Sequence, residues 1–283
     1  MKIDAYKFFN RTENVNTYKS SMYKNVDLNE GYPANLKRLE IIINLLKKYK
    51  PKKVVDAGCG AAMPLIKLRK LGFNVTGYDK SDNMIEEARN NLIQNRLDPK
   101  YVSKDDFEKV RTIKNNSIEC IIGLGTFYYS RDFKTTLIKQ VSKLKKNGRL
   151  IFSLRNQLFD IATMNDYSID FFTKFFDLES RNSKEKVKFK SFFSGFTKKK
   201  NENIDTKKVF SVSHNPITID DEILSKVGLK LEGIYYYHFH ILPPTFEKFN
   251  KLKFREESLK IENPNDWKGM FKASCFVVNC KKM

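Results

Sequence analysis

The sequence has few of the features that mark membrane, secreted and metal-binding proteins. Among its 283 residues, no apolar run approaches the roughly 20 residues of a membrane-spanning helix. The N-terminal stretch MKIDAYKFFNRTEN lacks the apolar segment of a signal peptide. The four cysteines show no CxxC pair and no other metal-ligand spacing. We therefore expect a reduced, cytoplasmic protein with no membrane span and no bound metal.

Acidic residues are scarce relative to basic ones. The chain has 33 Asp and Glu against 53 Lys and Arg, which gives a net charge of +20. Such an excess is typical of proteins that bind nucleic acid, a membrane surface or an acidic substrate. Lysine is spread along the whole chain, however, so a proteome rich in Lys, Asn and Ile would also explain it. The charge therefore leaves these alternatives open.

Strand-like and helix-like patterns alternate from Pro33 to Arg155. One predicted helix begins at Pro33, and another, which starts near Phe133, is predicted to end at Asn147-Gly148. The alternation predicts an α/β fold, a parallel sheet with helices on both faces. Strands are expected at residues 53–56, 74–79, 118–124 and 150–154 and, later in the chain, at 229–240 and 273–281.

The alternation stops after Arg155 for some 60 residues. Connections in such folds usually have about 2–6 residues, so this segment is predicted to be an insertion. Its first half is aromatic and helical in pattern, and its second half, residues 184–208, is basic with interleaved aromatic residues. The predicted organisation is an N-terminal arm or lid of residues 1–32, a main domain of residues 33–155 and 215–283, and an insertion of residues 156–214 that would cover a substrate.

The stretch VVDAGCGAAM, residues 54–63, places a carboxylate beside a glycine turn. The turn lacks the third glycine of the dinucleotide pattern GxGxxG, because Met63 stands there. Asp56 would also repel a pyrophosphate. S-adenosylmethionine has no phosphate, and its sulfonium and ammonium groups would be attracted by Asp56, while Gly58 and Gly60 let the backbone approach it closely. The stretch therefore favours S-adenosylmethionine over a dinucleotide.

A second carboxylate, Asp79, ends the next predicted strand, 19 residues after Gly60. It could accept hydrogen bonds from both hydroxyls of a ribose. Sites for NAD use the same feature, and a lone Asp at a strand end often caps the following helix instead. Asp79 supports a nucleoside-containing cofactor only in combination with the glycine turn.

Five motifs together resemble the class I S-adenosylmethionine-dependent methyltransferases. VVDAGCGAA is similar to their first motif, with Ala62 in place of the last glycine, and GYDKS is similar to their ribose-binding motif. VSKDDFEKV, SIECIIGLGTFYYSRD and LKKNGRLIFSLRN resemble the third motif, the fourth strand with its tip, and the fifth strand. The resemblance covers residues 33–155 and 215–283. It implies a Rossmann-like, seven-stranded, mostly parallel sheet of order 3-2-1-4-5-7-6 with an antiparallel seventh strand, and a helical or irregular insertion after strand five.

The resemblance also implies where the cofactor, S-adenosylmethionine, would bind. Asp105 or Asp106 would meet the adenine amino group, and Phe107 would flank the ring. Leu124, Gly125 and Thr126 would pass the methionine moiety. The complete set of expected cofactor-binding residues is Asp56, Gly58, Cys59, Gly60, Asp79, Lys80, Ser81, Met84, Asp105, Asp106, Phe107, Leu124 and Gly125.

Methyl transfer requires in-line positioning of the acceptor and often removal of a proton, so no fixed catalytic signature is expected. Ligands of open sheets lie beyond the C-terminal strand ends, where three segments of this chain should meet. Alternatives remain: packing for the tyrosines, a salt bridge of Arg155 to Asp160 or Asp170, and surface or hydrogen-bonded histidines. Two histidines alone do not make a metal site. The candidates are His240 and Tyr128 for catalysis, and Tyr129, Arg155, Asn156 and His238 for substrate binding.

Three functions fit these observations. The first is methylation of oxygen or nitrogen in a small polar or anionic metabolite, such as a sugar or secondary-metabolite intermediate. The second is an RNA or DNA methyltransferase that holds nucleic acid with residues 184–208, although the Asn/Asp-Pro-Pro-aromatic tetrad is absent from GLGTFY after the fourth strand. The third is a non-catalytic, cofactor-binding partner subunit. The sequence does not indicate an oligomeric state.

Overall fold

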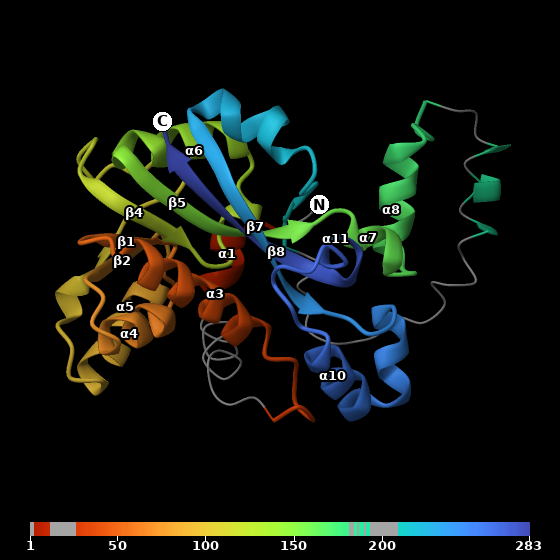
Figure 1. The fold of residues 1–283 in the computed structure, drawn as a ribbon, viewed down its shortest axis with the longest axis horizontal. Helices are drawn as coiled ribbons and strands as arrows, with labels where there is room; N and C mark the ends of the chain where they lie inside the picture. Colours follow the sequence, from red (N-terminus) through yellow and green to blue (C-terminus); the bar gives the residue numbers. More distant parts are fainter. Residues whose placement is uncertain (1–2, 12–26, 181–183, 186, 190, 193–208) are drawn as a thin grey trace.

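A mixed β-sheet forms the centre of the computed structural model, which describes residues 3–11, 27–180 and 209–283 and parts of the stretch between (Figure 1). The strand order is β3-β2-β1-β4-β5-β8-β7, and the short β6 pairs with β5 beside this path. β8 runs antiparallel to β5 and β7, and the other pairs are parallel. The strands are β1 (Val54–Ala57), β2 (Val75–Asp79), β3 (Val102–Lys104), β4 (Ile118–Gly123), β5 (Leu144–Asn156), β6 (Ser213–His214), β7 (Leu229–Phe239) and β8 (Ala273–Lys282).

This topology confirms the predicted order 3-2-1-4-5-7-6, with β7 as the sixth and β8 as the antiparallel seventh strand. The two-residue strand β6 is an addition that the sequence did not predict. It brings the end of the insertion back to the C-terminal end of β5, where Arg155 pairs with Ser213.

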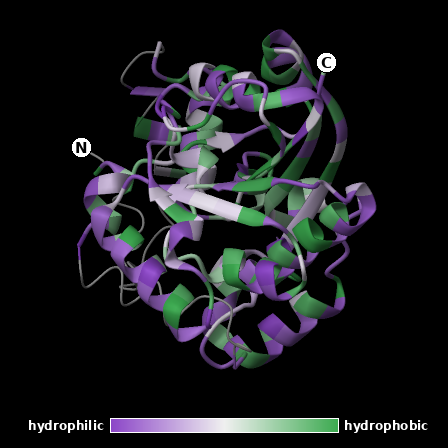
Figure 2. Cartoon of the chain, turned by 90° about the vertical axis from the view of Figure 1, so that its left-hand side faces the viewer, coloured by the Kyte–Doolittle hydropathy of each residue, from purple (hydrophilic) through white to green (hydrophobic). Residues whose placement is uncertain are grey.

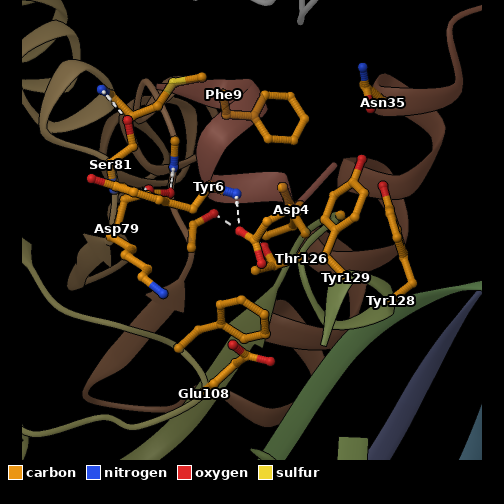
Figure 3. Close-up of a pocket in the computed structure, with 18 of the residues that line it drawn as sticks. Asp4, Tyr6, Phe9, Asn35, Asp79, Ser81, Glu108, Thr126, Tyr128 and Tyr129 are labelled. Atoms are coloured by element: carbon orange, nitrogen blue, oxygen red, sulfur yellow. Dashed lines mark hydrogen bonds between the residues drawn. The ribbon is translucent and has the colours of Figure 1, made fainter. Parts of the chain in front are cut away.

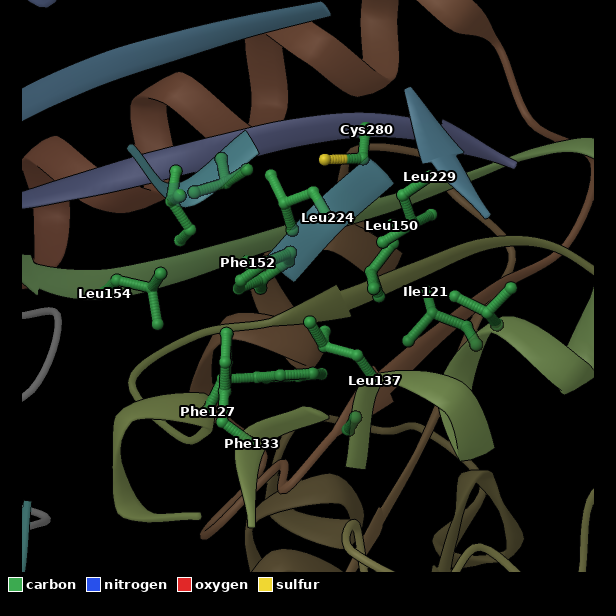
Figure 4. Packing of buried hydrophobic residues seen from close by; sticks show 14 of the residues in the cluster. Ile121, Phe127, Phe133, Leu137, Leu150, Phe152, Leu154, Leu224, Leu229 and Cys280 are labelled. Atoms are coloured by element: carbon green, nitrogen blue, oxygen red, sulfur yellow. The ribbon is translucent and has the colours of Figure 1, made fainter. Parts of the chain in front are cut away.

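Helices cover both faces of the sheet, as predicted (Figure 1). Each face has its own apolar cluster, because successive side chains of a strand point to opposite faces. Val54 of β1 packs with α3 and α4 in one cluster, while Val55 packs with α6 and the turns before β7 in the other, part of which Figure 4 shows. The helices are α1 (Ala5–Phe9), α3 (Ala34–Tyr49), α4 (Met63–Lys70), α5 (Asp82–Gln94), α6 (Phe133–Lys143), α7 (Phe159–Ala162), α8 (Asp166–Phe175), α10 (Lys251–Lys260) and α11 (Gly269–Lys272).

Hydrophilic and hydrophobic stretches alternate along the helices, while the central strands are largely apolar (Figure 2). α3 shows the reason: Leu39, Ile42 and Leu46 recur at helical spacing and are buried, with lysines on the opposite side. Within the part of the chain that the structure describes, no helix is long and apolar enough to cross a membrane.

The prediction that Asn147-Gly148 ends a helix is wrong. α6 ends at Lys143, and β5 begins at once with Leu144. β4 pairs with β5 at Ile118–Leu144 and next at Cys120–Arg149, so the Asn-Gly pair lies in an irregularity of the strand. Asn147 has a φ of 62°, which asparagine and glycine tolerate well, so the same residues suit a bulge as well as a helix end.

The insertion after β5 begins with α7 and α8, as the aromatic pattern predicted. Residues 193–208 of the basic segment, and residues 12–26 of the N-terminal arm, lie outside the described residues. The proposed domain boundaries, and the role of the insertion as a lid, therefore stay predictions.

Candidate active site

A cavity of about 140 Å³ lies at the C-terminal ends of β1, β2 and β4 (Figure 3). Residues from the predicted cofactor motifs make much of its wall, and the tips of β4 and the N-terminal arm complete it. This is the edge of the sheet where ligands of open α/β folds bind. The sequence-predicted residues that line it are Gly58, Gly60, Asp79, Lys80, Ser81, Met84, Phe107, Leu124, Gly125, Tyr128 and Tyr129.

Asp79 lines the cavity in the part of the wall that the predicted cofactor motifs form. Its Oδ2 accepts a hydrogen bond from the Gly60 N–H and its Oδ1 accepts one from the Ser81 N–H, both at 2.9 Å. Each carboxylate oxygen has a further lone pair, so both can still accept from a ligand hydroxyl. Burial raises the pKa of Asp79, and the backbone donors oppose this rise. The helix cap of α5 is Ser81, which accepts from the Met84 N–H, so capping does not occupy Asp79.

The glycine turn is built for close approach. Gly58 and Gly60 have φ angles of 76° and 51°, a region that residues with a Cβ rarely adopt. A Cβ on Gly58 would lie 2.4 Å from Cγ2 of Thr126, so the tip of β4 packs directly against the turn. Cys59, also expected at the cofactor, does not line the cavity, because its side chain is buried against the sheet.

Asp56 lies beneath the turn rather than in the cavity wall. Its side chain is 1% exposed, and neither carboxylate oxygen has a hydrogen-bond partner among the described residues. Burial raises the pKa of Asp56 to about 7, with a smaller upward effect of Asp79 and an opposing effect of Arg38. Asp56 is thus a buried acid without a hydrogen-bond partner among the described residues, and a cation bound against the turn would favour its ionised form.

Some residues of the third motif stabilise the loop, and one of them lines the cavity. Asp105 accepts hydrogen bonds from the N–H groups of Asp106, Arg111 and Thr112, so it closes its own loop and does not line the cavity. Asp106 forms an ion pair with Lys80 at 3.0 Å. Phe107 reaches the cavity.

The N-terminal arm covers the cavity, which the sequence suggested only in general terms. Tyr6 and Phe9 of α1 line it, and the Phe9 ring makes an edge contact with Tyr129 at 5.7 Å between centroids (Figure 3). Ser81 Oγ donates a hydrogen bond to Asn10 Oδ1 at 2.8 Å. The aromatic residues in the arm were the signal that an apolar surface had to be covered.

The arm is also tied to the segment that ends the insertion. The Phe210 N–H donates to the carbonyl of Ile3, and the Val212 N–H donates to the carbonyl of Tyr128, both at 2.8 Å. Arg131 forms an ion pair with Asp4, and its guanidinium lies 4.7 Å from the centroid of the Phe210 ring. Residues 209–213 therefore hold the arm and the tip of β4 together.

Arg38 of α3 is a cavity residue that sequence reasoning missed. Its side chain is 4% exposed, and its Nη2 donates to Oδ1 of Asn35 at 3.0 Å. A Cβ on Gly125 would lie 2.7 Å from Arg38 Nη1 and 3.2 Å from the Tyr128 hydroxyl, so these groups meet at the tip of β4. Burial raises the pKa of Tyr128, so its phenol stays protonated at neutral pH and can donate a hydrogen bond. Thr126, expected beside the methionine moiety, lines the cavity as well, and so do Glu108 and Asp4, which were not predicted.

Four of the predicted acceptor-side residues lie away from this cavity: Arg155, Asn156, His238 and His240. Asn156 Nδ2 donates to the carbonyls of Met270 and Ala273 at 2.9 and 2.8 Å, which anchors the end of β5. The rings of His238 and His240 are 4.6 Å apart, and neither lines the cavity.

The two histidines belong to a separate buried cluster. His238 stacks on Tyr32 and shares a 2.8 Å hydrogen bond with Ser274 Oγ. His240 packs against Phe159 and Phe254, and neither of its ring nitrogens has a partner among the described residues. Burial lowers the pKa of both rings, to about 4 for His238 and well below its ordinary value for His240. The described residues contain no group of three or more potential ligands that could hold a metal.

Arg155 lines a second cavity, of about 360 Å³, between the end of β5, α8 and residues 209–213. Its Nη1 donates to Ser211 Oγ at 3.0 Å, and its guanidinium lies 5.0 Å from the centroid of the Tyr167 ring. Across the described ranges Arg155 forms no direct ion pair with Asp160 or Asp170, although its charge lowers the pKa of the Asp160 carboxyl.

Comparisons with known proteins show the family to which the chain belongs. Residues 48–203, more than half of the chain, match the family described as a methyltransferase domain. Ubiquinone biosynthesis O-methyltransferase of Coxiella burnetii is 30% identical over 127 residues, which cover 45% of this chain and 52% of that protein. Glycine/sarcosine N-methyltransferase of Parasynechococcus marenigrum is 30% identical over 121 residues, 41% of this chain and 43% of that one. The chain thus spans about half the length of the curated relatives it matches.

A solved structure extends the likeness to nearly the whole chain. The magnesium protoporphyrin IX methyltransferase of Synechocystis PCC 6803, with bound S-adenosylhomocysteine, superimposes with a TM-score of 0.57 over 98% of both chains at 13% identity. At that identity the likeness shows the fold alone. Together with the match over residues 48–203, it identifies the chain as a member of the methyltransferase domain family, a class I enzyme that uses S-adenosylmethionine.

Proposed function

We propose that this methyltransferase transfers the methyl group of S-adenosylmethionine to an oxygen or nitrogen of a small polar or anionic metabolite. The observation that carries this proposal is the cover that α1 forms over the cofactor cavity. Tyr6 and Phe9 close the outer side, which leaves the approach past Tyr128 and Tyr129 for an acceptor of limited size. The names of the curated relatives, one an O- and one an N-methyltransferase of small molecules, support the same class.

The cavity residues suit the parts of the cofactor. Asp79 has free lone pairs for the ribose hydroxyls, and Met84 and Phe107 offer apolar and aromatic surface for the adenine. Arg38 lies at Gly125 and would pair with the carboxylate of the methionine moiety. Asp56 adds negative potential for the two cationic groups. When bound, the cofactor supplies an electrophilic methyl group on a sulfonium leaving group.

On the acceptor side, we propose that Tyr128 orients the acceptor as a hydrogen-bond donor. Its buried phenol is protonated at neutral pH, so it does not serve as a general base there. His240, the base expected from the sequence, has its ring among Phe159, Phe254 and His238 and does not line the cavity. We therefore propose that positioning and exclusion of water account for most of the catalysis.

The test is transfer of labelled methyl from S-adenosylmethionine into an extract of host cells. The extract is separated into small molecules, protein and nuclease-sensitive polymer, and Asp79→Asn serves as the control that should transfer little label. We expect label in the small-molecule fraction. Label in nuclease-sensitive polymer would instead assign the basic residues 184–208 to nucleic-acid binding and overturn the proposal. No transfer into any fraction would favour a non-catalytic role.

A further inference from the structure

We propose that the second cavity binds the methyl acceptor, and that the acceptor is a small zwitterion in which Arg155 holds the anionic group and the carboxylates of α7 and α8 hold a cationic amine. An amino acid is a compound of this kind. The inference rests on the proposed function, because it names the substrate class of that reaction. A volume of about 360 Å³ lies within the range of about 300–1,000 Å³ typical of pockets for small ligands.

Arg155 is the residue that would bind the anionic group of the ligand. Its guanidinium is largely buried, and the groups that it contacts directly, Ser211 and Tyr167, are neutral, although its charge also lowers the pKa of the Asp160 carboxyl in the same cavity. A buried guanidinium that forms no ion pair within the described part of the chain has N–H donors to spare. Burial of such a charge costs free energy unless it is paired, and a bidentate carboxylate or phosphate is the group that fits its fork.

The acidic residues of the cavity are the groups that would bind the cationic amine of the ligand. Asp160 of α7 and Asp166 and Asp170 of α8 line the same cavity, with Lys174 as the other basic residue. A lining that contains both acids and bases favours a ligand that carries both charges over one that carries only negative charge. Burial raises the pKa of Asp160 to about 6, and Asp170 adds to this rise, while Arg155 and a hydrogen bond with Ser213 oppose it. A positively charged amine would reverse the rise, because it favours the ionised carboxylate.

Aromatic side chains also line the second cavity. Tyr167, Phe171 and Phe210 line the cavity beside the polar groups. They provide apolar surface for the body of a ligand and make the charged contacts stronger by excluding water.

The second cavity borders the cofactor cavity at Tyr128. The Tyr128 side chain lines the cofactor cavity, and its carbonyl accepts from the N–H of Val212, which lines the second cavity. Arg155 also lies close enough to Tyr128 for each to influence the pKa of the other, so the two cavities are near each other at this point. An acceptor held at Arg155 would therefore reach the cofactor past Tyr128.

The first test determines the charge of the natural product. The labelled small molecule from the extract is applied to a cation exchanger at about pH 2, where an amine is positively charged. It is also applied to an anion exchanger at about pH 11, where a carboxylate or phosphate is negative and an amine is largely neutral. A zwitterion binds to both. A product that binds to only one exchanger overturns this inference but leaves the proposed function intact. Failure of the small-molecule fraction to take up label overturns the proposed function and this inference with it.

The second test uses Arg155→Met with that acceptor and Arg89→Met, an exposed arginine on α5, as the matched control. We expect the KM for the acceptor to rise roughly tenfold to hundredfold in Arg155→Met, because a charged hydrogen-bonded pair is lost. Cofactor affinity measured by calorimetry should stay unchanged in both variants. An unchanged KM in a variant that still binds the cofactor would refute the assignment of Arg155.

Discussion

Replacement of Asp56 by asparagine should make the cofactor-free protein more stable, and increasingly so as pH rises. The Asp56 carboxyl has an ordinary pKa of 3.8, and burial raises it to about 7 in the folded protein. A carboxyl whose pKa rises on folding favours the folded state when protonated, so stability falls between these two pH values and stays low above them. Asparagine has a similar shape and no charge, so it removes this loss.

The size of the effect follows from the same values. The difference between 3.8 and about 7 corresponds to about 4 kcal/mol, because one pKa unit is worth about 1.4 kcal/mol. The value of 7 already contains the favourable interaction with Arg38. We expect Asp56→Asn to gain about 2 kcal/mol at about pH 5 and about 4 kcal/mol at about pH 8.

Urea unfolding of the cofactor-free protein at the two pH values measures this gain. Asp221→Asn, at an exposed carboxylate, controls for the loss of a surface charge. The same Asp56→Asn variant should bind S-adenosylmethionine more weakly, because the negative potential beneath the turn is lost. A variant that is less stable than the parent at pH 8, or a difference that does not change with pH, would refute the reasoning.

Three other substitutions test the site and its surroundings. Asp79→Asn should weaken cofactor binding roughly tenfold to hundredfold in calorimetry, because charged hydrogen bonds to the ribose are lost; an unchanged affinity would remove Asp79 from the ribose site. Gly58→Ala should cost about 1–3 kcal/mol more in thermal unfolding than Gly72→Ala. Both glycines have positive φ, but only the Cβ at Gly58 would meet a side chain, at 2.4 Å, so equal losses would contradict the packing of the turn. His240→Leu should be neutral or stabilising by about 1 kcal/mol, because two unpaired ring nitrogens are removed, whereas His238→Leu loses a hydrogen bond and should destabilise by a similar amount. The reverse order of the two histidine variants would show that His240 has a polar partner.

Local patterns predicted the sheet well because the pattern and the packing agree. Val54 and Val55 pack in apolar clusters on opposite faces of the sheet, and strands buried on both faces are therefore mostly apolar in sequence. The glycine turn and Asp79 were found for a related reason, since their backbone geometry depends on residues close in sequence.

Residues brought in from distant elements could not be predicted in this way. Arg38 lies at helical spacing from Ile41 and Ile42 on the buried face of α3, but this spacing does not indicate that its guanidinium reaches a cofactor cavity. The pairing of Asp105 with its own loop depends on hydrogen bonds that end at Thr112. Both facts require the folded chain, because sequence spacing does not say which side chain turns inward.

We expect the link between the arm and residues 209–213 to determine the order in which cofactor and acceptor bind. The backbone of Ile3 accepts from Phe210, and the carbonyl of Tyr128 accepts from Val212, so the cover of the cofactor and a wall of the second cavity share one segment. Because Tyr6 and Phe9 of the arm line the cofactor cavity, we expect the arm to move when the cofactor enters or leaves. We expect compulsory-order kinetics, with S-adenosylmethionine entering first and S-adenosylhomocysteine leaving last. Product inhibition by S-adenosylhomocysteine should then be competitive only against S-adenosylmethionine, and release of the spent cofactor, which requires the arm to open, would limit turnover.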